Sequence, residues 1–287
     1  MKRPLGYVAA DVEGMSPTEL TDALTVIGYQ AVDWTMEQFD PLEEPPERLA
    51  ELVAIADAQR LRVPQLMVHQ DYVVDDSAEW EARVRRSELA VDAAAAAAVP
   101  SVGVVTGPNR WVEGWRRVPQ DIDERTAREL VTRALERVVD RAEGTGVKVA
   151  LEPCWGTLAW NATETDRLLE EIDGLSLNLD PSHFVMTGED PAELAHRWRE
   201  RIVHVHLKDA FGVNGSEGED FCFLLPGEGA TDWHAFFNSL DQIGYNGVMS
   251  VEFESFGLRE QALGGSVIEG ARLANDLVRG LLRSADE

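Results

Sequence analysis

Cysteine and lysine are scarce in this sequence. Its 287 residues include two cysteines, Cys154 and Cys222, and its lysines are Lys2, Lys148 and Lys208. Two cysteines are too few for a disulfide framework. The first residues lack the apolar core of a signal peptide, and no segment approaches the about 18 consecutive apolar residues of a membrane span. These absences predict a soluble, cytoplasmic protein.

Positive charge is scarce as a whole. Lys and Arg number 26 against 52 Asp and Glu, which gives a formal net charge of −26. Nucleic-acid binding depends on cationic contacts that release counterions from phosphates, so this balance argues against DNA and RNA as partners. Anionic membrane surfaces are excluded for the same reason. The excess of acid indicates a solvated surface and carries no information about the fold.

Short apolar segments alternate with longer segments of helical periodicity along the whole sequence. Several helix starts show an oxygen-bearing capping residue with a glutamate three residues later, as at Ser16–Glu19, Asp76–Glu79, Asn161–Glu164 and Asp190–Glu193. Strict alternation of strand and helix predicts a parallel sheet with right-handed crossovers. The expected strands are Leu5–Ala9, Ala31–Thr35, Pro64–Val68, Ser101–Val105, Val147–Glu152, Leu175–Asp180, Ile202–His206 and Val248–Glu252.

Eight strand and helix units suit a closed α/β barrel. Such barrels take about 250 residues as one domain. The rival architecture is an open doubly wound sheet with a glycine-rich phosphate turn after its first strand, but Ala10–Met15 contains no such turn. No linker rich in Pro, Gly or Ser divides the chain. We therefore predict a single-domain (β/α)8 TIM barrel over residues 1–287.

The last four expected strands carry polar residues on a face that barrels normally fill with apolar side chains. The period of two along a strand directs Glu152, Asp180, His206 and Glu252 toward the barrel axis. All four fall at the C-terminal ends of consecutive strands, the end at which barrel enzymes hold their active sites. Neighbouring strands lie about 4.8 Å apart, so these side chains can converge on one point.

A bound metal ion explains why ionisable groups would gather inside the barrel, because an uncompensated buried charge costs several kcal/mol. Three carboxylates and one imidazole favour one divalent ion, with Mn²⁺ first and Mg²⁺, Co²⁺ or Zn²⁺ as alternatives. The competing interpretation is a metal-free network with Lys148, Lys208 and His204. Three converging carboxylates would repel one another strongly without a cation, which favours the metal.

The strand-end motifs resemble those of the xylose-isomerase-like TIM barrels. The matching segments are Leu151–Pro153 (LEP), Leu179–His183 (LDPSH), His204–Asp209 (HVHLKD) and Val251–Glu254 (VEFE). The resemblance covers the whole chain as topology and is specific from about Lys148 onward. This superfamily contains sugar isomerases, ketose epimerases, inosose dehydratase and endonuclease IV.

The resemblance implies one divalent ion held by Glu152, Asp180, His206 and Glu252. It also implies that His183 lies beside the substrate or serves as an extra ligand, and that the chain forms a homodimer or tetramer. Endonuclease IV needs a larger cluster of histidines than the six in this chain, and the charge of −26 also argues against a DNA enzyme.

These residues suit proton transfer next to a carbonyl group. A metal that binds adjacent carbonyl and hydroxyl oxygens acidifies the intervening C–H and stabilises an enediolate. We predict Glu152 and Glu252 as the catalytic pair on opposite sides of a bound sugar. The expected function is a sugar isomerase or epimerase, with an inosose dehydratase-type lyase as the alternative. A metal-binding protein without turnover is a further alternative, against which the intact glutamates argue.

Four more residues are candidates for substrate binding: His183, Lys208, His69 and Trp155. Structural alternatives are hydrogen bonding for the two histidines, a salt bridge to Glu252 or Glu254 for Lys208, and ordinary packing for Trp155. The expected substrate is an uncharged small sugar or cyclitol.

Three further interpretations concern residues around these candidates. We expect His204 to be hydrogen-bonded in the core rather than a ligand. Trp34 and Trp160 contribute either to an apolar wall or to packing. Arg110, Arg116 and Arg117 have the chemistry to clamp an anion, but charge balance is their simpler role.

Overall fold

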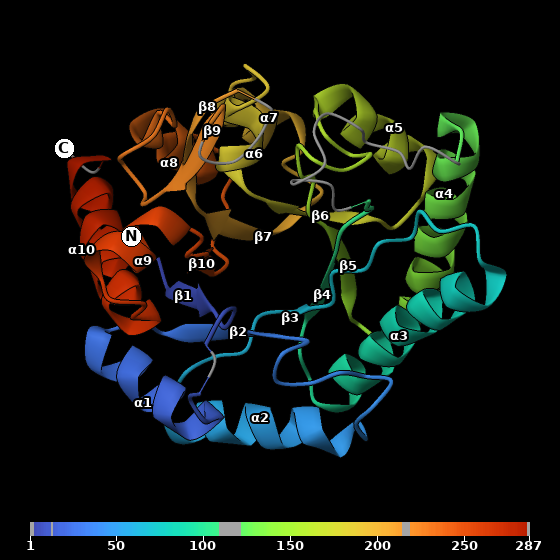
Figure 1. Ribbon diagram of the computed structural model, residues 1–287, viewed down its shortest axis with the longest axis horizontal. Helices are drawn as coiled ribbons and strands as arrows, with labels where there is room; N and C mark the ends of the chain where they lie inside the picture. The colour runs from blue at the N-terminus through green and yellow to red at the C-terminus, as the bar shows by residue number, and fades with distance from the viewer. Residues whose placement is uncertain (1–2, 13, 109–121, 214–218, 286–287) are drawn as a thin grey trace.

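The computed structural model describes residues 3–12, 14–108, 122–213 and 219–285 and contains a closed barrel of eight parallel strands. Figure 1 looks along this barrel, with the strands inside a ring of helices. The strand order around the barrel is β1-β10-β7-β6-β5-β4-β3-β2, which confirms the predicted (β/α)8 fold. The barrel strands are β1 Leu5–Val8, β2 Ala31–Thr35, β3 Leu66–Met67, β4 Ser101–Val104, β5 Lys148–Leu151, β6 Ser176–Leu179, β7 Ile202–Leu207 and β10 Met249–Val251.

All eight expected strands are present, and their ends differ by a few residues. The largest difference is at β3, which was expected over Pro64–Val68. Pro64 has no N–H to donate to a neighbouring strand, and the regular strand begins two residues later, at Leu66. Val68 lies beyond the strand but still donates its N–H to Gly103 O, with an N···O distance of 2.8 Å.

The helices begin at the positions that the capping residues predicted. Asp76 and Asn161 accept hydrogen bonds from the third residue after them, and at Ser16 the Glu19 carboxylate also reaches back. Asp190 instead accepts from Ala192 N. The helices are α1 Pro17–Ile27, α2 Glu47–Ala58, α3 Ser77–Ala96, α4 Glu124–Ala142, α5 Ala162–Glu171, α6 Pro181–Val185, α7 Pro191–Arg197, α8 Trp233–Gln242, α9 Phe256–Ala262 and α10 Val267–Ala285.

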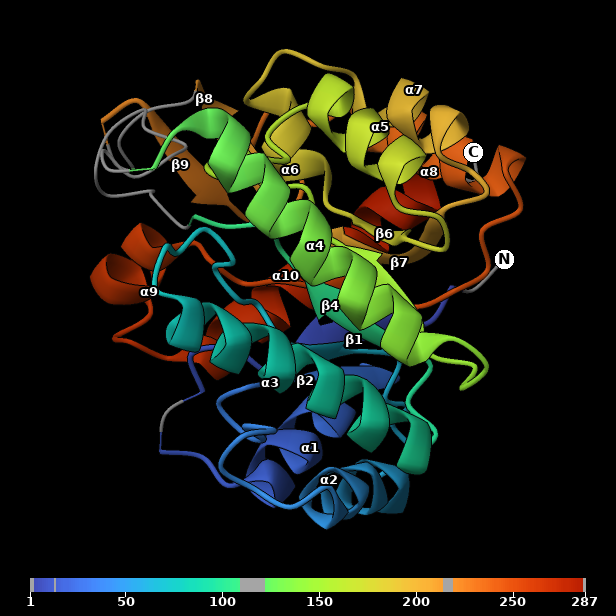
Figure 2. The same cartoon turned by 90° about the vertical axis from the view of Figure 1, so that its right-hand side faces the viewer.

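One element was not predicted: a two-stranded antiparallel hairpin of β8 Asp209–Gly212 and β9 Phe221–Leu224. Figures 1 and 2 place this hairpin and α9 at the same end of the barrel. Because β8 follows β7 directly, this is the C-terminal end of the barrel strands. The hairpin therefore covers the end at which the predicted site lies.

The apolar core lies mainly between the strands and the helices. Outward residues such as Val149, Leu151 and Leu177 are at most 1% exposed, and Ala93 and Ala94 are buried on α3. Within the described residues, no helix has the length and apolar character needed to cross a membrane.

Candidate metal centre and active site

Four neighbouring strands bring Glu152, Asp180, His206 and Glu252 together inside the barrel. Glu152, Asp180 and Glu252 directly follow β5, β6 and β10, and His206 lies in β7. One oxygen or ring nitrogen from each residue lies within 4.8 Å of those of the others. The exposed fractions are 7% for Glu252 and at most 1% for the other three. The structure thus makes a buried cluster of the four predicted ligands.

His206 connects two of the carboxylates. Its Nδ1 lies 3.2 Å from Glu152 Oε2 and 3.7 Å from Glu252 Oε2. Asn178 donates a hydrogen bond from Nδ2 to the same Glu152 oxygen at 2.8 Å. Burial alone raises the pKa of Glu152, but the adjacent His206 and His183 lower that pKa well below its usual value. Glu152 is therefore held as a carboxylate, the form that binds a cation.

Lys208 lies among the carboxylates, as the structural alternative for this residue, a salt bridge to Glu252 or Glu254, requires. Its Nζ is 3.2 Å from Asp180 Oδ2 and 2.6 Å from Glu254 Oε2, and it also pairs with Glu252. Burial lowers the pKa of Lys208, but these carboxylates raise it well above the usual value. The ion pairs that the metal-free interpretation requires are therefore present at Lys208. It is wrong for Lys148, which is exposed at the start of β5 because the N-terminal end of that strand opens to solvent.

The donor set fits a divalent cation. Even if His206 is protonated, it and Lys208 supply two positive charges, against the carboxylates of Glu152, Asp180, Glu252 and Glu254. Burial raises the pKa of Glu254 to about 7 although Lys208 opposes the shift, which indicates how poorly this site tolerates a further negative charge. Hard oxygen donors with one imidazole are suited to Mn²⁺, Mg²⁺, Co²⁺ or Zn²⁺.

The four candidates for substrate binding also surround this cluster. His183 Nε2 lies 3.7 Å from Asp180 Oδ2, and His69 Nε2 lies 3.6 Å from Glu152 Oε2. Burial lowers the pKa of His69, which favours its neutral ring. Trp155 is buried, and its ring contacts Phe221 of the hairpin. The positions agree with the predicted roles, which remain predictions.

An apolar cover over the site was missed by the sequence analysis. Trp155, Met186, Ala210, Phe221 and Phe223 form a separate buried cluster, to which the hairpin contributes the last three residues. Phe221 meets Trp155 edge to face at 5.0 Å, and Lys208 Nζ lies 4.6 Å from the Phe223 ring centre. The alternation Phe221-Cys222-Phe223 was the available signal for a strand with one buried face.

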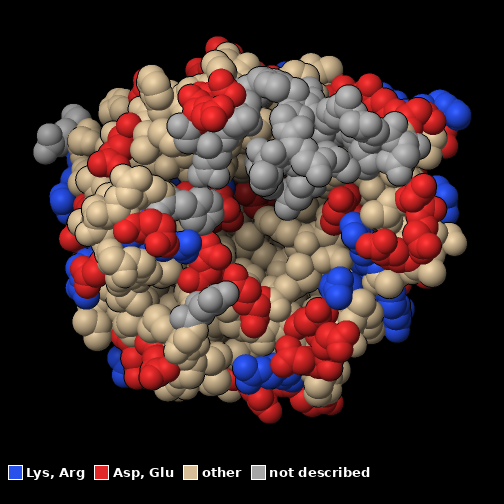
Figure 3. Space-filling model, in the orientation of Figure 1, with Lys and Arg blue, Asp and Glu red and all other residues tan. Residues whose placement is uncertain are grey.

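Figure 3 shows the surface at this end of the barrel. Acidic side chains lie on several sides of a central hollow, and basic side chains lie both at its right-hand edge and at the periphery. The surface is therefore consistent with the acidic composition of the chain.

The sequence profile of the xylose isomerase-like TIM barrel family matches residues 22–276. The chain belongs to this family. The resemblance deduced from the strand-end motifs is thereby confirmed. This xylose isomerase-like barrel has further similarity to individual proteins, both in sequence and in structure.

An inosose dehydratase from Lacticaseibacillus casei is 31% identical to this chain over 139 residues, which are 44% of this chain and 47% of that protein. The chain thus matches about half the length of this curated relative. The crystal structure of 3-keto-D-glucoside 4-epimerase, YcjR, from E. coli superposes with a TM-score of 0.74 at 16% identity, covering 98% of this chain and 100% of that one. A structure of the IOLI protein with a bound zinc atom gives a TM-score of 0.72 at 18% identity, covering 98% and 97%. Identities this low show the shared fold alone.

Other residues of this xylose isomerase-like barrel have structural roles. His204 is hydrogen-bonded in the core as expected, with Asp33 as its partner. Trp34 is fully buried in the main core and is therefore a packing residue. Burial raises the pKa of Cys154 well above its usual value, which makes it a poor nucleophile. Arg110, Arg116 and Arg117 lie outside the described residues.

The role of Asp209 was also not predicted, although this residue ends the HVHLKD motif. Its carboxylate accepts hydrogen bonds from five N–H groups, at N···O distances of 2.8 to 3.1 Å. The donors are the backbone N–H groups of Ala210, Gly227, Gly229 and Thr231 and the indole Nε1 of Trp233. Asp209 therefore ties the loop after β9 to the start of β8.

Proposed function

We propose that this chain is a divalent-metal-dependent enzyme that removes a proton from the carbon next to the carbonyl of a small sugar or cyclitol. The observation that carries the proposal is the buried convergence of Glu152, Asp180, His206 and Glu252. These residues would hold the ion, with Mn²⁺ as the first choice. When bound, the ion would polarise the substrate carbonyl and stabilise the enediolate charge.

Glu152 and Glu252 are the candidates for proton transfer, since they lie on strands three positions apart around the barrel. Each of these carboxylates has a nitrogen-bearing side chain beside it: His69 lies beside Glu152, and Lys208 pairs with Glu252. Lys208 can donate a hydrogen bond to a substrate oxygen on which negative charge develops. The apolar cover formed by Trp155, Phe221 and Phe223 would exclude water from the reacting carbon.

Two outcomes can follow proton removal. We place dehydration of a cyclitol ketone first, because the inosose dehydratase relative supports it at 31% identity. Sugar epimerisation or isomerisation, the outcome expected from the sequence, is the second candidate. The placement of Glu152 and Glu252 on separated strands favours it, because a base and an acid on two sides of one carbon can invert its configuration.

The experiment has two arms. Metal analysis of the purified protein, followed by chelation and reloading with Mn²⁺, tests the ion. Incubation of the reloaded protein with ketoses and inososes in D₂O tests the chemistry: an enone or diketone product supports dehydration, and deuterium in recovered sugar supports epimerisation or isomerisation. No metal uptake, or neither product with any substrate, would count against the proposed function.

Two variants make the metal arm specific to the cluster. Asp180→Asn should lose metal uptake, since it removes a charged ligand. Glu228→Gln is the matched control, because Glu228 is an exposed carboxylate in the loop that follows β9. Equal metal uptake by the two folded variants would place the ion elsewhere.

A further inference from the structure

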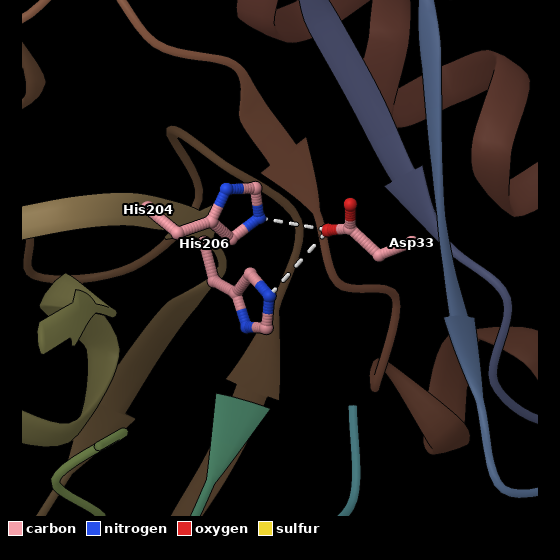
Figure 4. A group of neighbouring side chains, drawn as sticks. All are labelled: Asp33, His204 and His206. Atoms are coloured by element: carbon pink, nitrogen blue, oxygen red, sulfur yellow. Dashed lines mark hydrogen bonds and ion pairs between the residues drawn. The ribbon is translucent and has the colours of Figure 1, made fainter. Parts of the chain in front are cut away.

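A third buried carboxylate, Asp33, lies on the far side of His206 from Glu152 and Glu252. Asp33 Oδ2 lies 2.8 Å from His204 Nε2 and 3.7 Å from His206 Nε2, as the dashed lines in Figure 4 show. The two imidazoles meet edge to face, with ring centres 5.3 Å apart. His206 therefore has Asp33 beside Nε2 and Glu152 beside Nδ1.

This contact crosses the barrel interior. Asp33 belongs to β2 and the histidines belong to β7, and β1 and β10 lie between these strands. The intervening strands present small residues: Gly6 pairs in register with Ser250, which pairs with His206. A Cβ at Gly6 would lie only 2.3 Å from Ser250 Oγ. Small residues here leave room for the side chains of Asp33, His204 and His206 to meet.

The environment of Asp33 favours a charged acceptor. Its side chain is fully buried, and Oδ1 has no hydrogen-bond partner among the described residues. The other oxygen, Oδ2, faces Nε2 of both His204 and His206. A buried carboxylate needs hydrogen-bond donors, and these two imidazoles are the side chains that can supply them here.

A metal-ligating histidine commonly donates its second ring N–H to a carboxylate, which fixes the orientation of the ring. We propose that Asp33 is a positioning residue that holds the Nε2 edge of His206, so that Nδ1 faces Glu152 and Glu252, and that His204 holds Asp33 in turn. The inference rests on the proposed metal-dependent function and adds two residues outside the predicted ligand set.

The test compares three variants of the full chain. Asp33→Asn keeps the size of the side chain and removes its charge. His204→Gln removes the imidazole that bonds Asp33. Gln65→Leu is the matched control, since Gln65 is fully buried but its amide contacts Ser101 rather than His206. Circular dichroism establishes folding, the visible absorption of added Co²⁺ measures affinity and stoichiometry, and metal-free crystal structures give the orientation of His206.

We expect Asp33→Asn to weaken Co²⁺ binding by about 10- to 100-fold and to release the His206 ring from its present orientation. His204→Gln should weaken binding by a smaller factor, and Gln65→Leu should stay within about twofold of the unmodified chain. This ranking supports positioning, because a merely structural role would lower stability and leave the Co²⁺ affinity of the folded protein unchanged.

Other results would overturn the inference. One is a folded Asp33→Asn protein that binds Co²⁺ within about twofold of the unmodified chain. Two Co²⁺ ions per chain, with one lost in Asp33→Asn, would assign Asp33 and His204 to a metal site of their own. If the unmodified chain binds no Co²⁺, the proposed function fails, and the metal-free crystal structures then decide the role of Asp33. A rotated His206 ring in Asp33→Asn supports the positioning role, and an unmoved ring overturns it. If Asp33→Asn does not fold, the same comparisons are made with His204→Gln.

Discussion

Lys208 Nζ lies 3.2 Å from Asp180 Oδ2, so a lysine and a predicted metal ligand share one buried site. Lys208 is 2% exposed and also contacts Glu252 and Glu254. An ammonium in this position offsets repulsion between carboxylates that would otherwise be buried together. It also places a hydrogen-bond donor next to the catalytic candidate Glu252. We therefore expect Lys208 to contribute both to the stability of the site and to its predicted chemistry.

Removing the Lys208 charge should destabilise the metal-free protein. Lys208→Met keeps the length of the side chain but leaves the buried carboxylates without their cation, so we expect the free energy of unfolding to fall by about 3–5 kcal/mol. Urea unfolding with a chelator present measures this loss. Mn²⁺ should recover part of it, because the ion supplies positive charge to the same carboxylates.

Lys148→Met is the matched control for that measurement. Lys148 is exposed, so its substitution should change the free energy of unfolding by no more than about 0.5 kcal/mol. Equal effects of the two substitutions would show that the charge of Lys208 does not stabilise the cluster.

Asp209→Asn should weaken the attachment of the loop that follows β9. An amide group of the same shape places an NH₂ toward backbone N–H donors, so several of the five hydrogen bonds to the Asp209 carboxylate are lost. Hydrogen bonds to a charged acceptor contribute about 1.5–3 kcal/mol each, and we expect a total loss of about 3 kcal/mol or more in urea unfolding. Glu228→Gln, in the same loop but exposed, should be nearly neutral.

The fold could be predicted because its signals are local. Each barrel strand is a short segment with apolar residues on at least its outer face, and helix starts such as Ser16 and Asp76 carry their capping residues within a few positions. The four predicted ligands were also accessible, since the period of two and the position at a strand end are properties of each strand alone.

The missed residues depend on pairings between distant segments. Asp33, whose role was not predicted, is 171 residues from its partner His204 in the sequence, and nothing near Asp33 distinguishes it from other aspartates. The role of Phe221 and Phe223 depends on the pairing of β9 with β8, which folds the hairpin over the site. Such contacts follow from the register and closure of the barrel, which no single segment specifies.

The contact between α3 and α4 should depend on pH through Glu81. Arg137 on α4 donates hydrogen bonds to Glu81 on α3 and lowers the pKa of this carboxyl. Because the folded pKa is depressed, the stabilisation is present above the unfolded value and is lost as pH falls through the folded value. Glu81→Gln should therefore lower the free energy of unfolding at pH 7, by less than about 1 kcal/mol for this exposed pair, and have no effect in acid. A double-mutant cycle with Arg137→Gln tests whether this effect comes from the Glu81–Arg137 ion pair. In the Arg137→Gln background, the effect of Glu81→Gln on the free energy of unfolding should no longer depend on pH.

Gly270 and Gly280 lie on the same helix, α10, but alanine should have opposite effects at the two positions. Replacing a helical glycine by alanine gains about 1 kcal/mol from helix propensity. At Gly270 the added Cβ would lie 2.2 Å from the ring of Phe253, a buried side chain that cannot move away freely. Overpacking of this kind costs about 1–3 kcal/mol, so Gly270→Ala should be destabilising. At Gly280 the nearest neighbour is 4.0 Å away, at the end of the Arg283 side chain, so Gly280→Ala should raise the free energy of unfolding in urea. A stabilising effect of the same size at both positions would mean that α10 does not pack against Phe253 in solution.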